Sequence, residues 1–177
     1  MNASQLSLEN FAGYTGVGAL QILGWFFVID GITGFYALVE QYASSASWQI
    51  FFSVAVIALA YLLGAISSIV GALIVEVGSS TVIKIYAAAG RVSSASSYLV
   101  LEDWLKKSGI LKGSAVSALV LAAGSAIEGQ SGFMEKFGNV GLAGGVLGLG
   151  LALLAGWTAR ILDARALESL VALERAS

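Results

Sequence analysis

Residues 50–75 read IFFSVAVIALAYLLGAISSIVGALIV, and this stretch decides the fold class of the chain. It runs for 26 residues without one charged side chain. A helix of about 20 apolar residues is long enough to cross the roughly 30 Å hydrocarbon core of a bilayer. The segment Ile50–Val75 is therefore predicted to be a transmembrane helix. Three further segments, 20–39, 110–127 and 140–162, are long and poor in charge in the same way.

The composition supports the same class of protein. Hydrophobic residues make up 58% of the 177 residues, charged residues only 11%, and the mean hydropathy is +0.87. A soluble domain has about 45 to 50% apolar and about 25% charged residues. The prediction is an all-α, polytopic integral membrane protein that forms one membrane domain over residues 1–177, with the lipid bilayer as its first partner.

The absent residue types exclude several functions. The chain has no cysteine, histidine or proline. Disulfides, thiolate chemistry, imidazole general bases, histidine-bound haem and most transition-metal sites are excluded, so no cofactor and no metal are expected. The predicted spans also hold no two carboxylates at helical spacing, and we expect no enzyme activity. The net charge of −2 and the lack of a dense basic run argue against nucleic acid.

The basic residues predict the orientation, because Lys and Arg are retained on the cytoplasmic side of a membrane. Four spans with both termini cytoplasmic place eight of the nine basic residues inside and only Lys136 outside. The inside set is Lys84, Arg91, Lys106, Lys107, Lys112, Arg160, Arg165 and Arg175. The expected location is thus the inner (plasma) membrane, with the tail 163–177 continuing the fourth helix into the cytoplasm.

The connection 78–109 is too long for a hairpin turn. Tyr98, Leu101 and Leu105 recur at i, i+3 and i+7 beside Trp104, which predicts an amphipathic helix on the cytoplasmic leaflet. Serines at 93, 94, 96 and 97 predict a break in it. The helix is either a membrane-surface paddle or partner contact, or a connector packed on its own bundle. Lys112 is expected to extend its amine to the interface.

Small residues recur along every span. Helices in lipid have no hydrophobic drive to associate, so close approach through small residues supplies the contact. The predicted packing residues are Gly24, Gly31, Gly34, Gly64, Ser68, Ala118, Ala122, Gly141, Gly144, Gly145 and Gly148. So many stripes favour a homo-oligomer or contacts with other membrane subunits. The alternative is that glycine is simply common in membrane helices.

The run GLAGGVLGLG at 141–150 resembles the packed inner helices of ring-forming subunits such as the ATP synthase rotor ring. That family is a two-span hairpin, whereas this chain has four predicted spans. The resemblance is therefore confined to these ten residues.

Asp30 is the ionisable residue of interest, because it falls near the middle of the predicted span 20–39. A charge at that depth costs about 2.5 to 3.5 kcal/mol, so the side chain should face other helices or a wet cavity. Hydroxyls expected to bond it are Thr33, Tyr61, Ser67 and Ser68. Asp30 is interpreted either as a proton or cation site or as a structural clamp; a third interpretation is a helix break at Asp30–Gly31 with half-helix ends around a binding site.

Two functions remain open from the sequence. The first is a self-assembled, ion-conducting or membrane-permeabilising pore, in which Glu40, Glu128 and Glu135 would form an acidic outer vestibule. The second is a non-catalytic accessory or scaffold subunit that stabilises a larger membrane complex. Outside such a pore, Glu40, Glu76 and Glu128 are expected to be solvated residues at span ends.

Overall fold

The computed structural model describes residues 3–43, 46–76, 80–91, 95–131 and 139–176. Within these ranges the chain is almost entirely helical and forms no strand. The helices are α1 (Ala3–Thr33), α2 (Phe35–Ala43), α3 (Ala46–Glu76), α4 (Ser80–Arg91), α5 (Ala95–Ser131) and α6 (Val140–Ala176). The predicted all-α class is confirmed.

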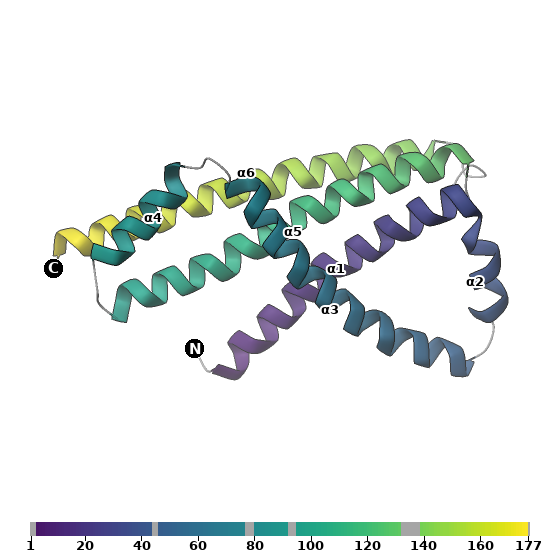
Figure 1. Cartoon of the computed structure of the whole chain (residues 1–177), viewed down its shortest axis with the longest axis horizontal. Helices are drawn as coiled ribbons and strands as arrows, with labels where there is room; N and C mark the ends of the chain where they lie inside the picture. Colours follow the sequence, from purple (N-terminus) through teal and green to yellow (C-terminus); the bar gives the residue numbers. More distant parts are fainter. Residues whose placement is uncertain (1–2, 44–45, 77–79, 92–94, 132–138, 177) are drawn as a thin grey trace.

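Four of these helices are long and apolar enough to cross a membrane. The candidate membrane-spanning segments are Leu8–Thr33 in α1, Phe52–Ile74 in α3, Ala95–Gly129 in α5 and Gly141–Ala176 in α6. Successive long helices alternate in direction, so the N- and C-termini lie toward the same end of the molecule (Figure 1). The chain is therefore a polytopic membrane protein with four membrane-spanning helices.

The first span differs from the prediction. The segment 20–39 is not one helix, because α1 ends at Thr33 and α2 begins at Phe35. Between them Gly34 adopts a left-handed conformation with φ of 67°, which a glycine accepts without steric cost. The apolar part of α1 instead begins at Leu8. Asp30 consequently lies in the last turn of α1 and not at mid-span.

α1 and α5 lie side by side and run in the same direction. Three glycines of α1 meet α5 in constant register: Gly13 faces Ile110, Gly24 faces Leu121 and Gly31 faces Glu128. A Cβ placed on Gly24 would lie 2.7 Å from the backbone nitrogen of Leu121, so only glycine allows this approach. The predicted packing roles of Gly24 and Gly31 are thus seen in contacts within one chain.

α3 crosses both of these helices through small residues. Gly64 meets the backbone of Tyr14 and Gly18 on α1, and Ser68 meets Gly113 on α5. Ala118 of α5, another predicted packing residue, is also buried, at 1% exposure. Figure 1 shows that α3 is inclined to the other long helices and diverges from α1 toward the end that carries α2.

α5 and α6 form an antiparallel pair. The backbones of Gly129 and Gly141 touch at one end, and Ala122 packs against Gly148 farther along. Gly144 and Gly145 also face α5, near Ser125 and Ala122. These four predicted packing glycines of α6 therefore all pack on a single neighbouring helix.

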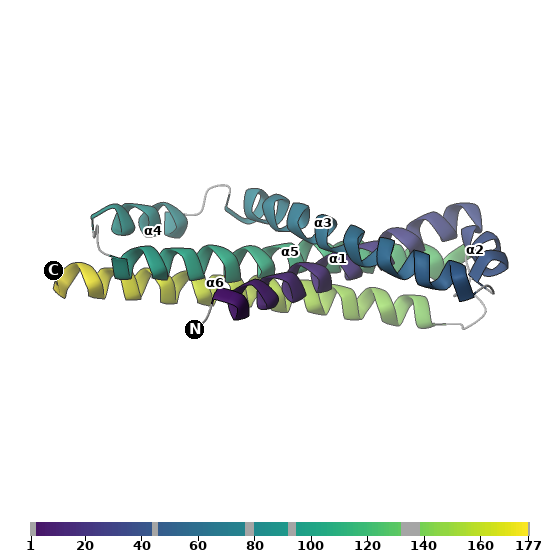
Figure 2. The same cartoon turned by 90° about the horizontal axis from the view of Figure 1, so that it is seen from below.

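α5 and α6 continue past the region where α1 and α3 cross, and α4 lies alongside their ends (Figures 1 and 2). The three helices share a small apolar core of Val82, Ile85, Ala88, Trp104, Ala166 and Leu170. The predicted continuation of the fourth helix into the tail is confirmed, since α6 reaches Ala176.

The connection 78–109 forms α4 and the first turns of α5, while serines 93 and 94 lie outside the described residues. Trp104 points into the three-helix core, whereas Tyr98 and Leu105 are exposed. The contacts of α4 and Trp104 match the connector alternative, in which this segment packs on its own bundle.

The first half of α3 has a different environment. Every residue from Ser53 to Leu59 is exposed, which covers all faces of nearly two helical turns. Val54 is 67% exposed and Ile57 is 49% exposed. The second half, from Ala60 onward, has one buried face that includes Ala60, Gly64 and Ser68.

Candidate functional site

Asp30 is 2% exposed and joins α1 to α2. Its backbone carbonyl accepts a hydrogen bond of 2.7 Å from the Gly34 amide, and its Oδ1 accepts one from the Tyr36 amide in the first turn of α2. A carboxylate at that position satisfies an amide that the helix leaves without a partner, and it suits the positive end of the helix dipole. The observed geometry is that of a cap across a helix break, and the break lies at Gly34 instead of at Asp30–Gly31.

The side chains whose hydroxyl groups are expected to form hydrogen bonds with Asp30 have other partners in the structure. Thr33 Oγ1 donates to the Ile29 carbonyl at 2.7 Å, and Ser68 Oγ donates to the Gly64 carbonyl at 2.9 Å. Ser67 Oγ donates to Gln21 Oε1, and the Tyr61 ring stacks on Phe11. Tyr61, Ser67 and Ser68 lie along the contacts of α3 with α1 and α5, more than two helical turns from the end of α1. Gly34, expected to pack helices, is exposed and ends α1.

Glu128 is fully buried, so the prediction that it is a solvated residue at a span end is wrong. It lies against Gly31, the residue after Asp30, because a Cβ on Gly31 would come within 3.2 Å of Glu128 Cα. Glu40 is exposed, and Glu135 lies outside the described residues. One of the three acids expected in an outer vestibule thus lies inside the α1–α5 contact.

Near the middle of α5, Lys112 forms a buried ion pair with Asp163 of α6. Lys112 Nζ lies 3.6 Å from Asp163 Oδ2, and the two side chains are 1% and 9% exposed. Asp163 Oδ1 accepts hydrogen bonds from Trp104 Nε1 at 2.7 Å and from Ser108 Oγ at 3.0 Å. Lys112 Nζ also sits 5.4 Å from the centre of the Trp104 ring. The carboxylate is therefore compensated by one cation and two neutral donors.

This ion pair corrects the expectation that Lys112 extends to the interface. It also shows a site that sequence reasoning missed, because Asp163 was placed in a solvated tail. One signal was present in the sequence: Trp104, Ser108 and Lys112 recur at intervals of four and share one face of α5. The cluster connects α5 to α6 near the point where these two helices extend past α1 and α3 toward α4.

The chemistry of these clusters is structural in kind. A buried ion pair with further hydrogen bonds holds two helices in one register, and a carboxylate cap fixes the angle of a helix break. Among the described residues, no group of three or more acidic side chains could hold a metal ion. Comparison with protein-family models, with curated proteins and with solved structures finds no match to this chain.

Proposed function

We propose that this chain is a non-catalytic structural subunit of a membrane assembly. In this proposal the first half of α3, residues 53–59, contacts the transmembrane helices of neighbouring subunits. The observation that carries the proposal is the exposure of these residues on every face of the helix. A helix in a membrane bundle gains stability by packing on its neighbours, and this segment gains little from its own chain.

The tight helix crossings favour a structural subunit over a channel formed by one chain. Backbones approach closely at Gly18–Gly64, Gly24–Leu121 and Gly129–Gly141. These contacts leave little room for water or ions between the helices concerned. The small residues at these crossings already pack on helices of the same chain. Contacts between subunits would therefore rely on the larger apolar side chains of α3, such as Val54 and Ile57.

The orientation is part of the proposal. Both termini lie toward the end of the molecule that carries α4, the start of α5 and the end of α6 (Figure 1). Lys84 and Arg91 of α4 and Arg175 in the last turn of α6 belong to the same end. By the positive-inside rule we propose that this end faces the cytoplasm of the plasma membrane.

Cross-linking tests the proposed contact, and the lack of native cysteine makes single-cysteine variants clean probes. We expect Val54→Cys and Ile57→Cys, in native membranes, to cross-link to a neighbouring subunit. The matched control is Leu153→Cys, at a residue that is 76% exposed on α6. An adduct of doubled mass identifies a second copy, and another mass identifies a different subunit. Equal yields at Leu153 and at the α3 positions would refute the proposal.

A pore built from several copies is the second candidate function. It is favoured by buried polar side chains on the faces that α5 turns toward its neighbouring helices: Ser108, Lys112, Ser117, Ser125 and Glu128. The Ser117 hydroxyl has no hydrogen-bond partner among the described residues. If subunits opened α1 away from α5, Glu128, which lies against Gly31 of α1, would face the opening. Ion flux into liposomes that contain the purified chain would support this function, particularly if Asp30→Asn changed the flux.

A further inference from the structure

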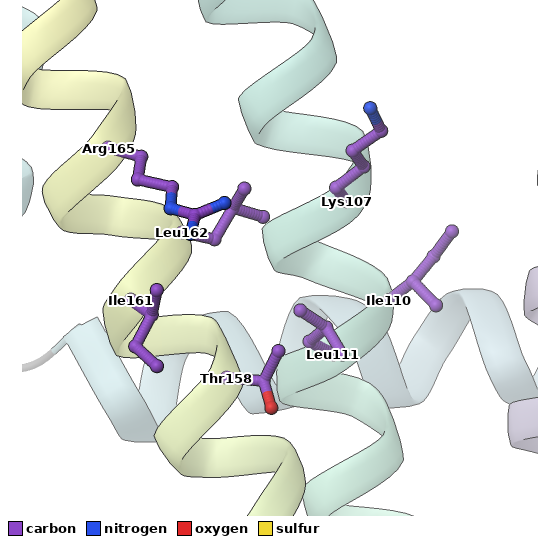
Figure 3. Close-up of a pocket in the computed structure, with 7 residues that line it drawn as sticks. All are labelled: Lys107, Ile110, Leu111, Thr158, Ile161, Leu162 and Arg165. Carbon is purple, nitrogen blue, oxygen red and sulfur yellow. The ribbon is translucent and has the colours of Figure 1, made fainter.

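An apolar groove runs between α5 and α6 beside the Lys112–Asp163 pair. Its volume is about 380 Å³, and its lining consists of Lys107, Ile110, Leu111, Thr158, Ile161, Leu162 and Arg165 (Figure 3). A second hollow of about 220 Å³ shares Leu111 and Thr158 with it and extends to Ala118, Leu151 and Leu20 of α1. The two hollows therefore lie next to each other along the bundle, and together they are called the track.

Only one end of this track carries charge. Figure 3 shows the Arg165 side chain extending from α6 toward α5. Lys107 lies on α5 at the same end of the groove, with its amine directed away from α6. Below them the lining is apolar, with Leu111 from α5 and Ile161 from α6. Helix α6 rises about 1.5 Å per residue, so the stretch from Gly141 to Ile161 spans about 30 Å, the thickness of the hydrocarbon core. Arg165 and Lys107 consequently lie at headgroup depth when the apolar track lies in the acyl region.

Both cations are available to a ligand. Arg165 is exposed, and its guanidinium forms no ion pair with the described residues. Lys107 pairs with Asp103 at 2.9 Å, but both side chains are more than half exposed, and such pairs on one helix are weak. Lys112, by contrast, is committed to Asp163 inside the protein. A phosphate at the mouth of the groove can thus be met by Arg165, and by Lys107 once its exposed side chain rotates toward the groove, without breaking the buried cluster.

We propose that this groove is a binding site for an anionic glycerophospholipid. The phosphate binds between Arg165 and Lys107, with the guanidinium supplying paired donors and the amine a point charge. One acyl chain follows the track past Leu111 and Thr158. A lipid is favoured over a free phosphate because the lining beyond the two cations is apolar, and basic pockets between membrane helices on the cytoplasmic side suit such headgroups.

The test is lipid binding to the purified, delipidated full chain, measured by native mass spectrometry with phosphatidylglycerol and phosphatidylcholine. We expect the chain to prefer phosphatidylglycerol, and Arg165→Gln to weaken its binding about fivefold, the effect of one basic residue near a membrane surface. Arg160→Gln is the matched control, because Arg160 is an exposed arginine on the same helix that does not line the groove. It should change the affinity less than twofold.

A second variant tests the acyl track separately from the charge. Thr158 is exposed and lies where the two hollows meet, so Thr158→Trp should fill the track and weaken binding without unfolding the chain. Leu153→Trp, at an exposed residue outside the lining of the groove, controls for bulk. Equal losses in Arg165→Gln and Arg160→Gln, or unchanged binding in Thr158→Trp, would overturn the proposal. Binding of phosphatidylcholine as tight as that of phosphatidylglycerol would overturn it too.

Discussion

Replacement of Lys112 by methionine measures the contribution of the buried ion pair, because methionine keeps most of the side-chain volume and removes the charge. The attraction across 3.6 Å between Lys112 Nζ and Asp163 Oδ2 amounts to about 4 to 5 kcal/mol at an effective dielectric constant of about 20. The loss of one partner from a buried pair typically costs about 3 to 5 kcal/mol. We expect Lys112→Met to lower the free energy of unfolding by that amount.

The assay is reversible unfolding of the purified chain in mixed detergent micelles, followed by far-ultraviolet circular dichroism. Lys107→Met is the control, since Lys107 lies on the same helix and forms an exposed pair with Asp103. It should cost no more than about 0.5 kcal/mol. The double variant Lys112→Met, Asp163→Asn should recover most of the loss, because asparagine still offers an oxygen to Trp104 and Ser108. A Lys112→Met cost equal to that of Lys107→Met would refute the buried pair.

Three further changes probe the fold by the same unfolding measurement. Gly24→Ala should lower the free energy of unfolding by about 1 to 3 kcal/mol, because the added Cβ meets the α5 backbone. Gly150→Ala is the control and should cost little, since a Cβ there meets nothing within 4 Å. Similar costs for the two variants would contradict the tight crossing. Asp30→Ala should cost about 1 kcal/mol through the lost cap on α2, and Asp30→Asn much less, since both residue types cap well; equal losses would argue against capping. Gly34→Ala should cost about 1 kcal/mol because alanine disfavours a φ of 67°, and an unchanged stability would mean that this turn is not populated.

Hydropathy was enough to predict the number and class of the long helices. The span predicted at 50–75 corresponds to the apolar segment Phe52–Ile74, and the fourth predicted span begins at the first residue of α6. Both segments are bounded by polar residues or glycine and contain no charge in their apolar part. The physical signal for insertion is therefore local to each segment.

The first span was misplaced because the residues on both sides of Gly34 are apolar. Hydropathy does not register a turn inside an apolar run, and the glycine was interpreted as a packing residue. The observed span Leu8–Thr33 also includes the polar residues Glu9 and Asn10 at its start. With the end of α1 at Thr33, Asp30 changes from a mid-membrane charge to a cap at a helix end.

Long-range pairs were beyond the reach of sequence patterns. Lys112 and Asp163 are 51 positions apart, and only the antiparallel pairing of α5 with α6 brings them together. The small-residue stripes were visible in the sequence, but their neighbours were not. Gly148, for example, packs on Ala122 within the chain, so its stripe no longer argues for contacts between copies.

Electrical recording on planar bilayers that contain only the purified chain tests most directly whether its helices close on one another. Close backbone contacts such as Gly24 on Leu121 predict a silent membrane across a wide range of voltage and protein density. A steady single-channel current from wild-type protein that Lys112→Met abolishes would contradict a closed structural subunit, because it would place the buried Lys112 side chain on an open ion path.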